Sequence, residues 1–79
     1  MTINVLAFGI AKDIFGGPSI SVELTGTPVS ELKEALERQY PRLKQIGSYM
    51  VAVNNEYAAD DLLLTERDEV AIIPPVSGG

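Results

Sequence analysis

Hydrophobic and polar residues alternate along several short segments of the chain. Residues 19–24 read Ser-Ile-Ser-Val-Glu-Leu, a period of two that is typical of a half-buried strand. Residues 2–8 are apolar on both faces of an extended chain, which predicts a central strand or a strand with one face used for a partner. The two faces of this segment hold Ile3, Val5 and Ala7 on one side, and Leu6 and Phe8 on the other. A short loop joins the two segments, so they predict an antiparallel pair.

Two segments have helical spacing instead. Ile10 and Ile14 lie four residues apart, which predicts one short helical turn closed by Gly16 and Gly17. Residues 27–41 form the one long helical pattern, and its apolar stripe falls at positions i, i+3 and i+7. Thr27 suits the N-cap and Pro28 the first helical position, while Pro41 ends the helix. The stripe consists of Val29, Leu32 and Leu36.

The second half of the chain predicts shorter strands. Residues 49–53 suit a strand that turns at Asn54 and Asn55, because asparagine tolerates the positive φ of a tight hairpin. A turn over 65–68 and a last strand over 69–73 follow. This order predicts an α+β roll of one domain, residues 1–79, in which one main helix packs across a mixed sheet of about five strands.

The composition removes most side-chain chemistry from consideration. The 79 residues include no cysteine and no histidine, so disulfides, thiolates and the usual nucleophile–base pairs are excluded, and zinc loses its best ligands. A net charge of −5 argues against nucleic acid, which is bound by clustered lysine and arginine. No signal peptide or membrane-spanning run is visible, which makes the cytoplasm the expected location.

The remaining acidic and glycine-rich clusters are interpreted as turns. Asp60-Asp61 and Asp68-Glu69 could bind a hard cation weakly, but their spacing matches no calcium loop. Gly16-Gly17 is surrounded by none of the residues of a phosphate-binding loop. No metal site and no bound cofactor are therefore predicted.

The C-terminal end combines stiffness with a lack of side chains. Pro74 and Pro75 cannot continue a central strand, and the chain then ends on two glycines. We call residues 74–79 the C-terminal arm, and expect it to be flexible and to project from the sheet. Residues without a Cβ atom can enter a narrow channel, so the Gly79 carboxylate is the candidate reactive group and Gly78 gives clearance. Bulky apolar residues near the arm suit either the core or a patch for a protein partner, and both interpretations stay open for Phe8, Ile73 and Val76.

The sequence of the arm and of the strand before it resembles a known family. "LTERDEVAIIPPVSGG", residues 64–79, is similar to the end of the MoaD/ThiS group of ubiquitin-like sulfur carriers, and most of all to MoaD, the small subunit of molybdopterin synthase. "INVLAFGIAKDIFG" and "AVNNEYA" are compatible with the same family. The resemblance implies a β-grasp fold. Arg67 departs from the family pattern, which usually has glycine there, so the turn either strains at positive φ or adopts another type.

The resemblance also implies a chemical role for Gly79. In this family an E1-like enzyme uses ATP to adenylate the terminal glycine, and a sulfurtransferase system converts it into a thiocarboxylate. The arm then enters the large subunit of molybdopterin synthase and donates sulfur to cyclic pyranopterin monophosphate, so the small subunit is not catalytic alone. The implied partner-binding residues are Phe8, Ile73, Pro74, Pro75, Val76 and Ser77. A carrier for thiazole synthesis or tRNA thiolation, and a ubiquitin-like modifier or docking module, are the alternatives.

Overall fold

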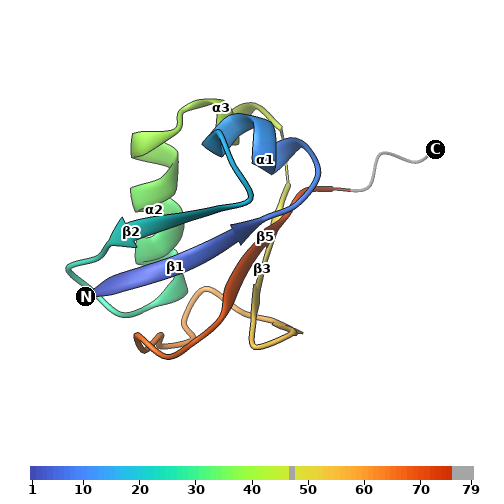
Figure 1. Ribbon diagram of the computed structural model, residues 1–79. Coiled ribbons are helices and arrows are strands. Elements are labelled where there is room, and N and C mark those ends of the chain that lie inside the picture. The colour runs from blue at the N-terminus through green and yellow to red at the C-terminus, as the bar shows by residue number, and fades with distance from the viewer. Residues whose placement is uncertain (47, 76–79) are drawn as a thin grey trace.

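The computed structural model describes residues 1–46 and 48–75 of the chain. Five strands and three helices follow one another, as Figure 1 shows. In chain order they are β1 (Thr2–Ala7), α1 (Ile10–Phe15), β2 (Ser19–Glu23), α2 (Val29–Gln39), α3 (Arg42–Gln45), β3 (Met50–Val53), β4 (Glu56–Tyr57) and β5 (Val70–Ile73).

The strands form one mixed sheet in the order β2-β1-β5-β3-β4. β1 pairs antiparallel with β2 and parallel with β5, while β3 pairs antiparallel with both β5 and β4. The last strand in sequence is therefore the central strand of the sheet. The predicted five-stranded mixed sheet and the antiparallel pairing of the first two strands are confirmed.

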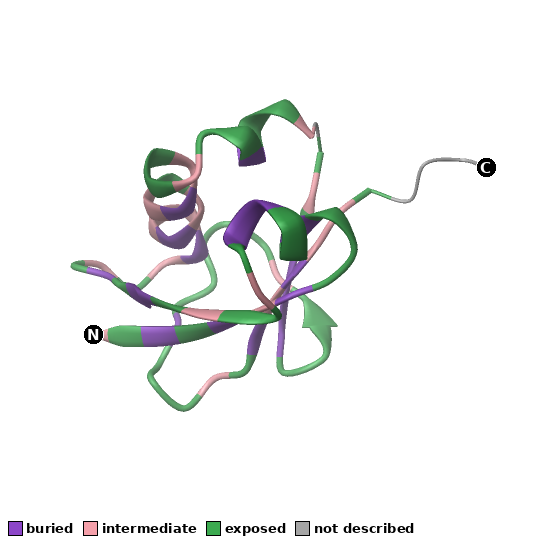
Figure 2. Cartoon of the chain, turned by 45° about the horizontal axis from the view of Figure 1, so that its top comes forward, coloured by how far each residue is buried: buried purple, intermediate pink, exposed green. Residues whose placement is uncertain are grey.

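The core lies between one face of this sheet and the helices. α2 lies across that face, and Figure 2 shows its buried residues turned toward the strands. α1 and α3 close the end of the same layer, where the Phe15 and Tyr40 rings pack 4.9 Å apart between their centroids. The strands contribute Ile3, Val5, Val22, Val51, Val53, Val70 and Ile72, and the helices contribute Ala11, Ile14, Phe15, Val29, Leu32, Leu36 and Leu43.

Two details of the helices differ from the sequence prediction. The N-cap of α2 is Pro28 in an extended conformation, so the prediction of Thr27 as N-cap and Pro28 as first helical residue is wrong. The reason is tertiary, because Thr27 accepts a backbone hydrogen bond from Leu64 and Val29 donates one to Leu62. These bonds keep residues 27 and 28 paired with the loop before β5. The short helix α3 is the second difference, because the sequence patterns predicted no helix there.

The predicted turns are confirmed at three places. Gly16 ends α1 in the left-handed conformation, with φ 81°. Asn54 and Asn55, between β3 and β4, have φ of 54° and 71°. Arg67 does not have a positive φ, so the turn before β5 adopts a type that tolerates arginine without strain. None of the helices in the described ranges is long and apolar enough to cross a membrane.

Candidate docking face and the base of the arm

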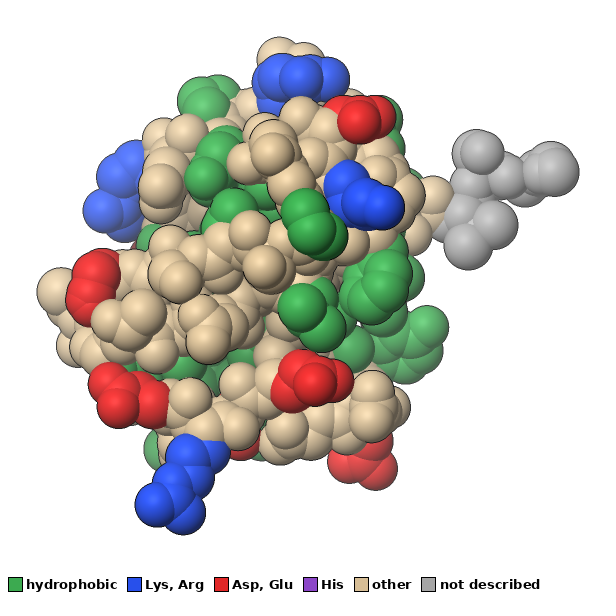
Figure 3. Space-filling model, viewed as in Figure 1, with side chains coloured by type: hydrophobic (Ala, Val, Ile, Leu, Met, Phe, Trp, Pro, Cys, Tyr) green, Lys and Arg blue, Asp and Glu red, His purple; other side chains and the backbone are tan. Residues whose placement is uncertain are grey.

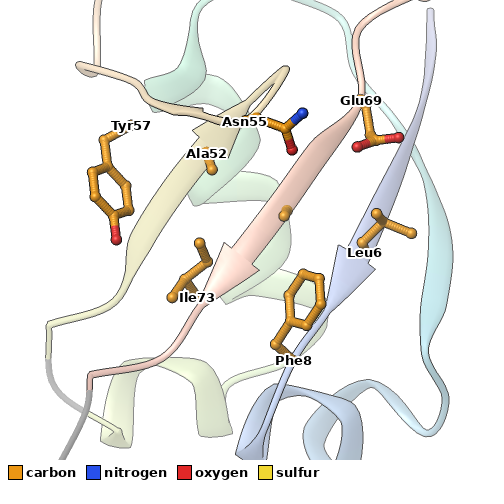
Figure 4. Close-up of a pocket in the computed structure, with 8 residues that line it drawn as sticks. Leu6, Phe8, Ala52, Asn55, Tyr57, Glu69 and Ile73 are labelled. Carbon is orange, nitrogen blue, oxygen red and sulfur yellow. The ribbon is translucent and has the colours of Figure 1, made fainter.

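The sheet face opposite α2 carries an apolar hollow. Side chains from β1, β3, β4 and β5 surround a volume of about 320 Å³ on this outer face, as Figure 4 shows. Because side chains alternate across a strand, the hollow is built from the residues that the core leaves out. The lining residues are Leu6, Phe8, Ala52, Asn55, Tyr57, Glu69, Ala71 and Ile73.

The register of the strands explains why the surface is hollow here. Ala71 of β5 lies opposite Leu6 on one side and Ala52 on the other, and Ala52 lies opposite Tyr57. One row across four strands therefore reads Leu6, Ala71, Ala52 and Tyr57, with two small residues between two large ones. The alanines form the floor, and the larger side chains stand as walls on either side.

The two ends of the hollow differ in chemistry. Asn55 and Glu69 lie at one end, and Phe8 and Ile73 lie at the other, beside the end of β5 (Figure 4). Phe8 is 50% exposed and Met50, the cross-strand partner of Ile73, is 46% exposed. Figure 3 shows hydrophobic side chains gathered on the side where the described chain ends, with acidic side chains at the border of that group. The hollow is thus apolar next to the arm, and Glu69 stands at its far end.

Hydrogen bonds fix the backbone at the acidic end of the hollow. The Glu69 amide donates to Asn54 Oδ1 at 2.9 Å, and the Asn54 amide donates to the Glu69 carbonyl at 2.8 Å. The Asp68 carboxylate accepts from the Thr65 amide at 2.8 Å and from Asn54 Nδ2 at 3.0 Å. These bonds, that of the Thr65 amide first, hold the pKa of Asp68 below its ordinary value. The Glu69 side chain therefore projects from a backbone that is bound on both sides.

The base of the arm rests on the turn after β1. Gly9 has φ 56° and ψ −132°, a conformation that residues with a side chain rarely adopt. A Cβ atom added to Gly9 would lie 3.2 Å from Cγ of Pro74, which is a tight contact. Since β1 and β5 run parallel, both strands end at the same edge of the sheet and bring Gly9 beside Pro74. The absence of a side chain at Gly9 is what lets the first residue of the arm approach so closely.

The structure places the predicted site residues in two groups. Phe8 and Ile73 lie together in the hollow and outside the core. Of the two positions that the sequence left open for them, core and surface, the structure shows the surface position. Pro74 and Pro75 follow directly after β5. The other predicted residues lie outside the described ranges: Val76, Ser77, Gly78 and Gly79.

Several residues that line the hollow were not predicted from the sequence. Tyr57, Asn55 and Ala52 come from the β3–β4 hairpin, which no pattern linked to the arm. A signal did exist in the last strand, because Glu69, Ala71 and Ile73 alternate with the core residues Val70 and Ile72. Extending the alternation rule to residues 69–73 would have put all three on the outer face.

One residue of each acidic cluster has a structural partner. Asp60 forms an ion pair with Lys33 of α2 at 2.9 Å, and Asp68 caps the turn before β5. Within residues 1–46 and 48–75, no three acidic side chains come together in a group that could hold a metal ion.

Comparison with known proteins places the chain among small carrier proteins. Residues 5–79 match the sequence profile of the ThiS family. The molybdopterin synthase sulfur carrier subunit of Arabidopsis thaliana is 37% identical over 98% of this chain and 82% of its own length. The protein of the same name from Mycobacterium tuberculosis is 39% identical over 98% of this chain and 96% of its own. The solution structure of the small archaeal modifier protein 1 from Methanosarcina acetivorans superposes with a TM-score of 0.82, at 27% identity, covering 99% of this chain and 96% of the other. The fold is accordingly the ubiquitin-like β-grasp that the sequence predicts.

Proposed function

The chain belongs to the ThiS family, and from this membership we propose that it is the sulfur-carrier subunit of molybdopterin synthase. The observation that carries the proposal is the sequence identity of 37% and 39%, over nearly the whole chain, to two proteins that bear this name. The terminal Gly78-Gly79 supports it, because a bare glycine end suits a carboxylate that must be presented to other enzymes.

The proposed chemistry takes place on the main chain at Gly79. Its carboxylate attacks the α-phosphorus of ATP on an E1-like enzyme, which releases pyrophosphate and leaves an acyl adenylate. A persulfide on a sulfurtransferase displaces AMP and forms an acyl disulfide. A thiol of the sulfurtransferase system then cleaves the S–S bond, which leaves a disulfide on that system and releases a thiocarboxylate, a soft nucleophile at neutral pH. The thiocarboxylate gives its sulfur to cyclic pyranopterin monophosphate, and water restores the carboxylate. No cysteine is needed, which suits a chain that has none.

The hollow on the outer face is the proposed docking site for the large subunit of the synthase. It is apolar at the end beside the start of the arm, and its residues lie outside the core cluster. Aromatic side chains such as Phe8 and Tyr57, which are 50% and 68% exposed, are typical anchors of protein interfaces. Docking there would hold the sheet while the arm reaches the active site of the partner.

An intact-mass measurement tests the proposal. The protein is co-expressed with its activating enzyme and sulfurtransferase, and we expect a mass increase equal to the exchange of one oxygen for one sulfur. Deletion of Gly79 should abolish the increase. Glu34→Gln, which changes an exposed residue of α2 and leaves the arm intact, is the control and should keep it. An increase that persists without Gly79 would overturn the proposal.

A second candidate function is supported by the likeness to an archaeal modifier protein. A modifier would join its terminal carboxylate to lysine side chains of other proteins. Isopeptide adducts of this chain on several cellular proteins, found by mass spectrometry, would favour that role. Co-purification with a thiazole synthase or a tRNA-thiolating enzyme, without the large synthase subunit, would instead favour a carrier of another pathway.

A further inference from the structure

The side chains that line the hollow indicate what kind of partner segment would bind in it. We propose that the outer-face hollow binds a segment of the large synthase subunit that carries one bulky apolar side chain next to a lysine or arginine, whose cationic group pairs with Glu69. This inference rests on the proposed function. It adds which side chains the partner segment must carry, and it names Glu69 as the residue that selects the cationic one.

The first argument is the sign of the charge. Among the lining residues within 1–46 and 48–75, Glu69 is the one that carries a charge, so this part of the chain gives the hollow a negative end and no compensating cation. In the described part of the chain the carboxylate of Glu69 has no hydrogen-bond or ion-pair partner, whereas Asp60 and Asp68 are both engaged. The chain as a whole carries −5, so its field favours a basic approach. A cation is therefore the group that the acidic end of the hollow suits.

The second argument is rigidity. The backbone of Glu69 is held through its amide and its carbonyl by Asn54, and the turn before it is held by Asp68. Asn55 has φ 71° in the tight turn between β3 and β4, and its side chain faces the same end of the hollow (Figure 4). The bound backbone limits the positions that the Glu69 carboxylate can reach, which lowers the entropic cost of binding a donor. A guanidinium or an ammonium group has donors for both the carboxylate and the Asn55 amide oxygen.

The third argument is the order of chemistries along the hollow. From the arm outward, a bound segment meets the apolar end at Phe8 and Ile73, then the floor of Ala71 and Ala52, and finally Glu69. The floor of two alanines leaves room for one large side chain between the walls. A cation at the far end then sets the direction of the segment, because the reversed segment would place its charge against Phe8. The hollow thus specifies both what binds and which way it runs.

Binding of the large synthase subunit to charge variants tests the inference. Affinity is measured by calorimetry at low and at physiological salt for Glu69→Gln, Glu69→Lys and the control Glu34→Lys, which makes the same charge change on exposed α2. We expect Glu69→Lys to weaken binding by about tenfold or more, because the ion pair is lost and the new lysine also repels the cation of the partner. Glu69→Gln should weaken binding by a smaller factor, because it only loses the ion pair. Glu34→Lys should bind like the wild type. The salt dependence of affinity should be smaller in Glu69→Gln than in the wild type.

A second variant separates the position of the site from its charge. Ala71→Leu fills the floor of the hollow on the outer face and should abolish binding without loss of folding, as circular dichroism can check. If Ala71→Leu blocks binding but Glu69→Lys binds like Glu34→Lys, the hollow is the docking site and the inferred cation is wrong. If neither variant affects binding, the inference as a whole fails. In both cases the thiocarboxylate measured by mass can still form, so the proposed function is judged separately.

Discussion

At the scale of single residues, Gly9 controls how the arm leaves the sheet. Substitution by alanine should cost about 1 kcal/mol of unfolding free energy or more, because its φ is 56° and a side chain is strained there. It should also displace Pro74, whose Cγ would lie 3.2 Å from the new Cβ. We expect Gly9→Ala to slow sulfur transfer severalfold in a single-turnover assay at saturating large subunit, while affinity measured separately changes little.

Gly16 provides the matched control for this prediction. Its φ is 81°, so Gly16→Ala suffers a similar backbone strain, but in the described part of the chain no atom beyond its sequence neighbours lies within 4 Å of the added Cβ. Urea unfolding should show that both variants lose stability, and only Gly9→Ala should transfer sulfur slowly. Equal transfer rates in the two variants would mean that the contact between Gly9 and Pro74 does not position the arm.

At the scale of elements, the turn that leads into β5 makes stability depend on pH. The pKa of Asp68 lies below its ordinary value of 3.8, because the Thr65 amide and Asn54 Nδ2 donate to the carboxylate. The folded state therefore binds the proton less tightly than the unfolded state does, and the stabilisation is complete above the unfolded pKa. It is lost as the pH falls through the lower, folded pKa. Asp68→Asn should therefore be less stable than the wild type at pH 6, and the difference should narrow as the pH falls below the ordinary pKa of 3.8.

Chemical denaturation at a series of pH values measures this difference directly. Asp61→Asn is the control, because it removes the same charge from an exposed loop position outside the turn. Its stability relative to the wild type should stay nearly constant over the same range. A gap for Asp68→Asn that does not narrow toward low pH would show that the carboxylate contributes through something other than its charge.

The same elements show what the sequence can and cannot predict. Alternation and helical spacing predicted the strands and α2, since burial of one face imposes a period on each segment. The four residues of α3 are too few to show a period, and the start of α2 depends on bonds to Leu62 and Leu64 that lie far along the chain. The hollow was not predictable for the same reason. It exists because β5 inserts between β1 and β3, which brings Ala71 opposite Leu6 and Ala52.

At the scale of the whole molecule, the sheet separates stability from recognition. One face is covered by helices and holds the core, and the other holds the hollow and continues into the arm. A domain of this size has only about 4–12 kcal/mol of stability, at roughly 0.05–0.15 kcal/mol per residue. Phe8 and Tyr57, which are exposed on the outer face, add little to that stability. The apolar outer face is explained if it is covered by a partner during sulfur transfer.

Two neighbouring residues of β5 test this separation within one strand. Ile72 is fully buried and faces the core, whereas Ile73 is half-buried and faces the hollow. Ile72→Ala should lower the free energy of unfolding by about 2–5 kcal/mol, because it leaves a cavity in the core. Ile73→Ala should cost about 1 kcal/mol or less, since its side chain already contacts solvent. Affinity for the large subunit should show the reverse order, with the larger loss in Ile73→Ala. Both affinities are measured under conditions in which both variants are folded. If Ile73→Ala destabilised the fold as strongly as Ile72→Ala and left affinity unchanged, both faces of the sheet would serve stability and the docking face would have to lie elsewhere.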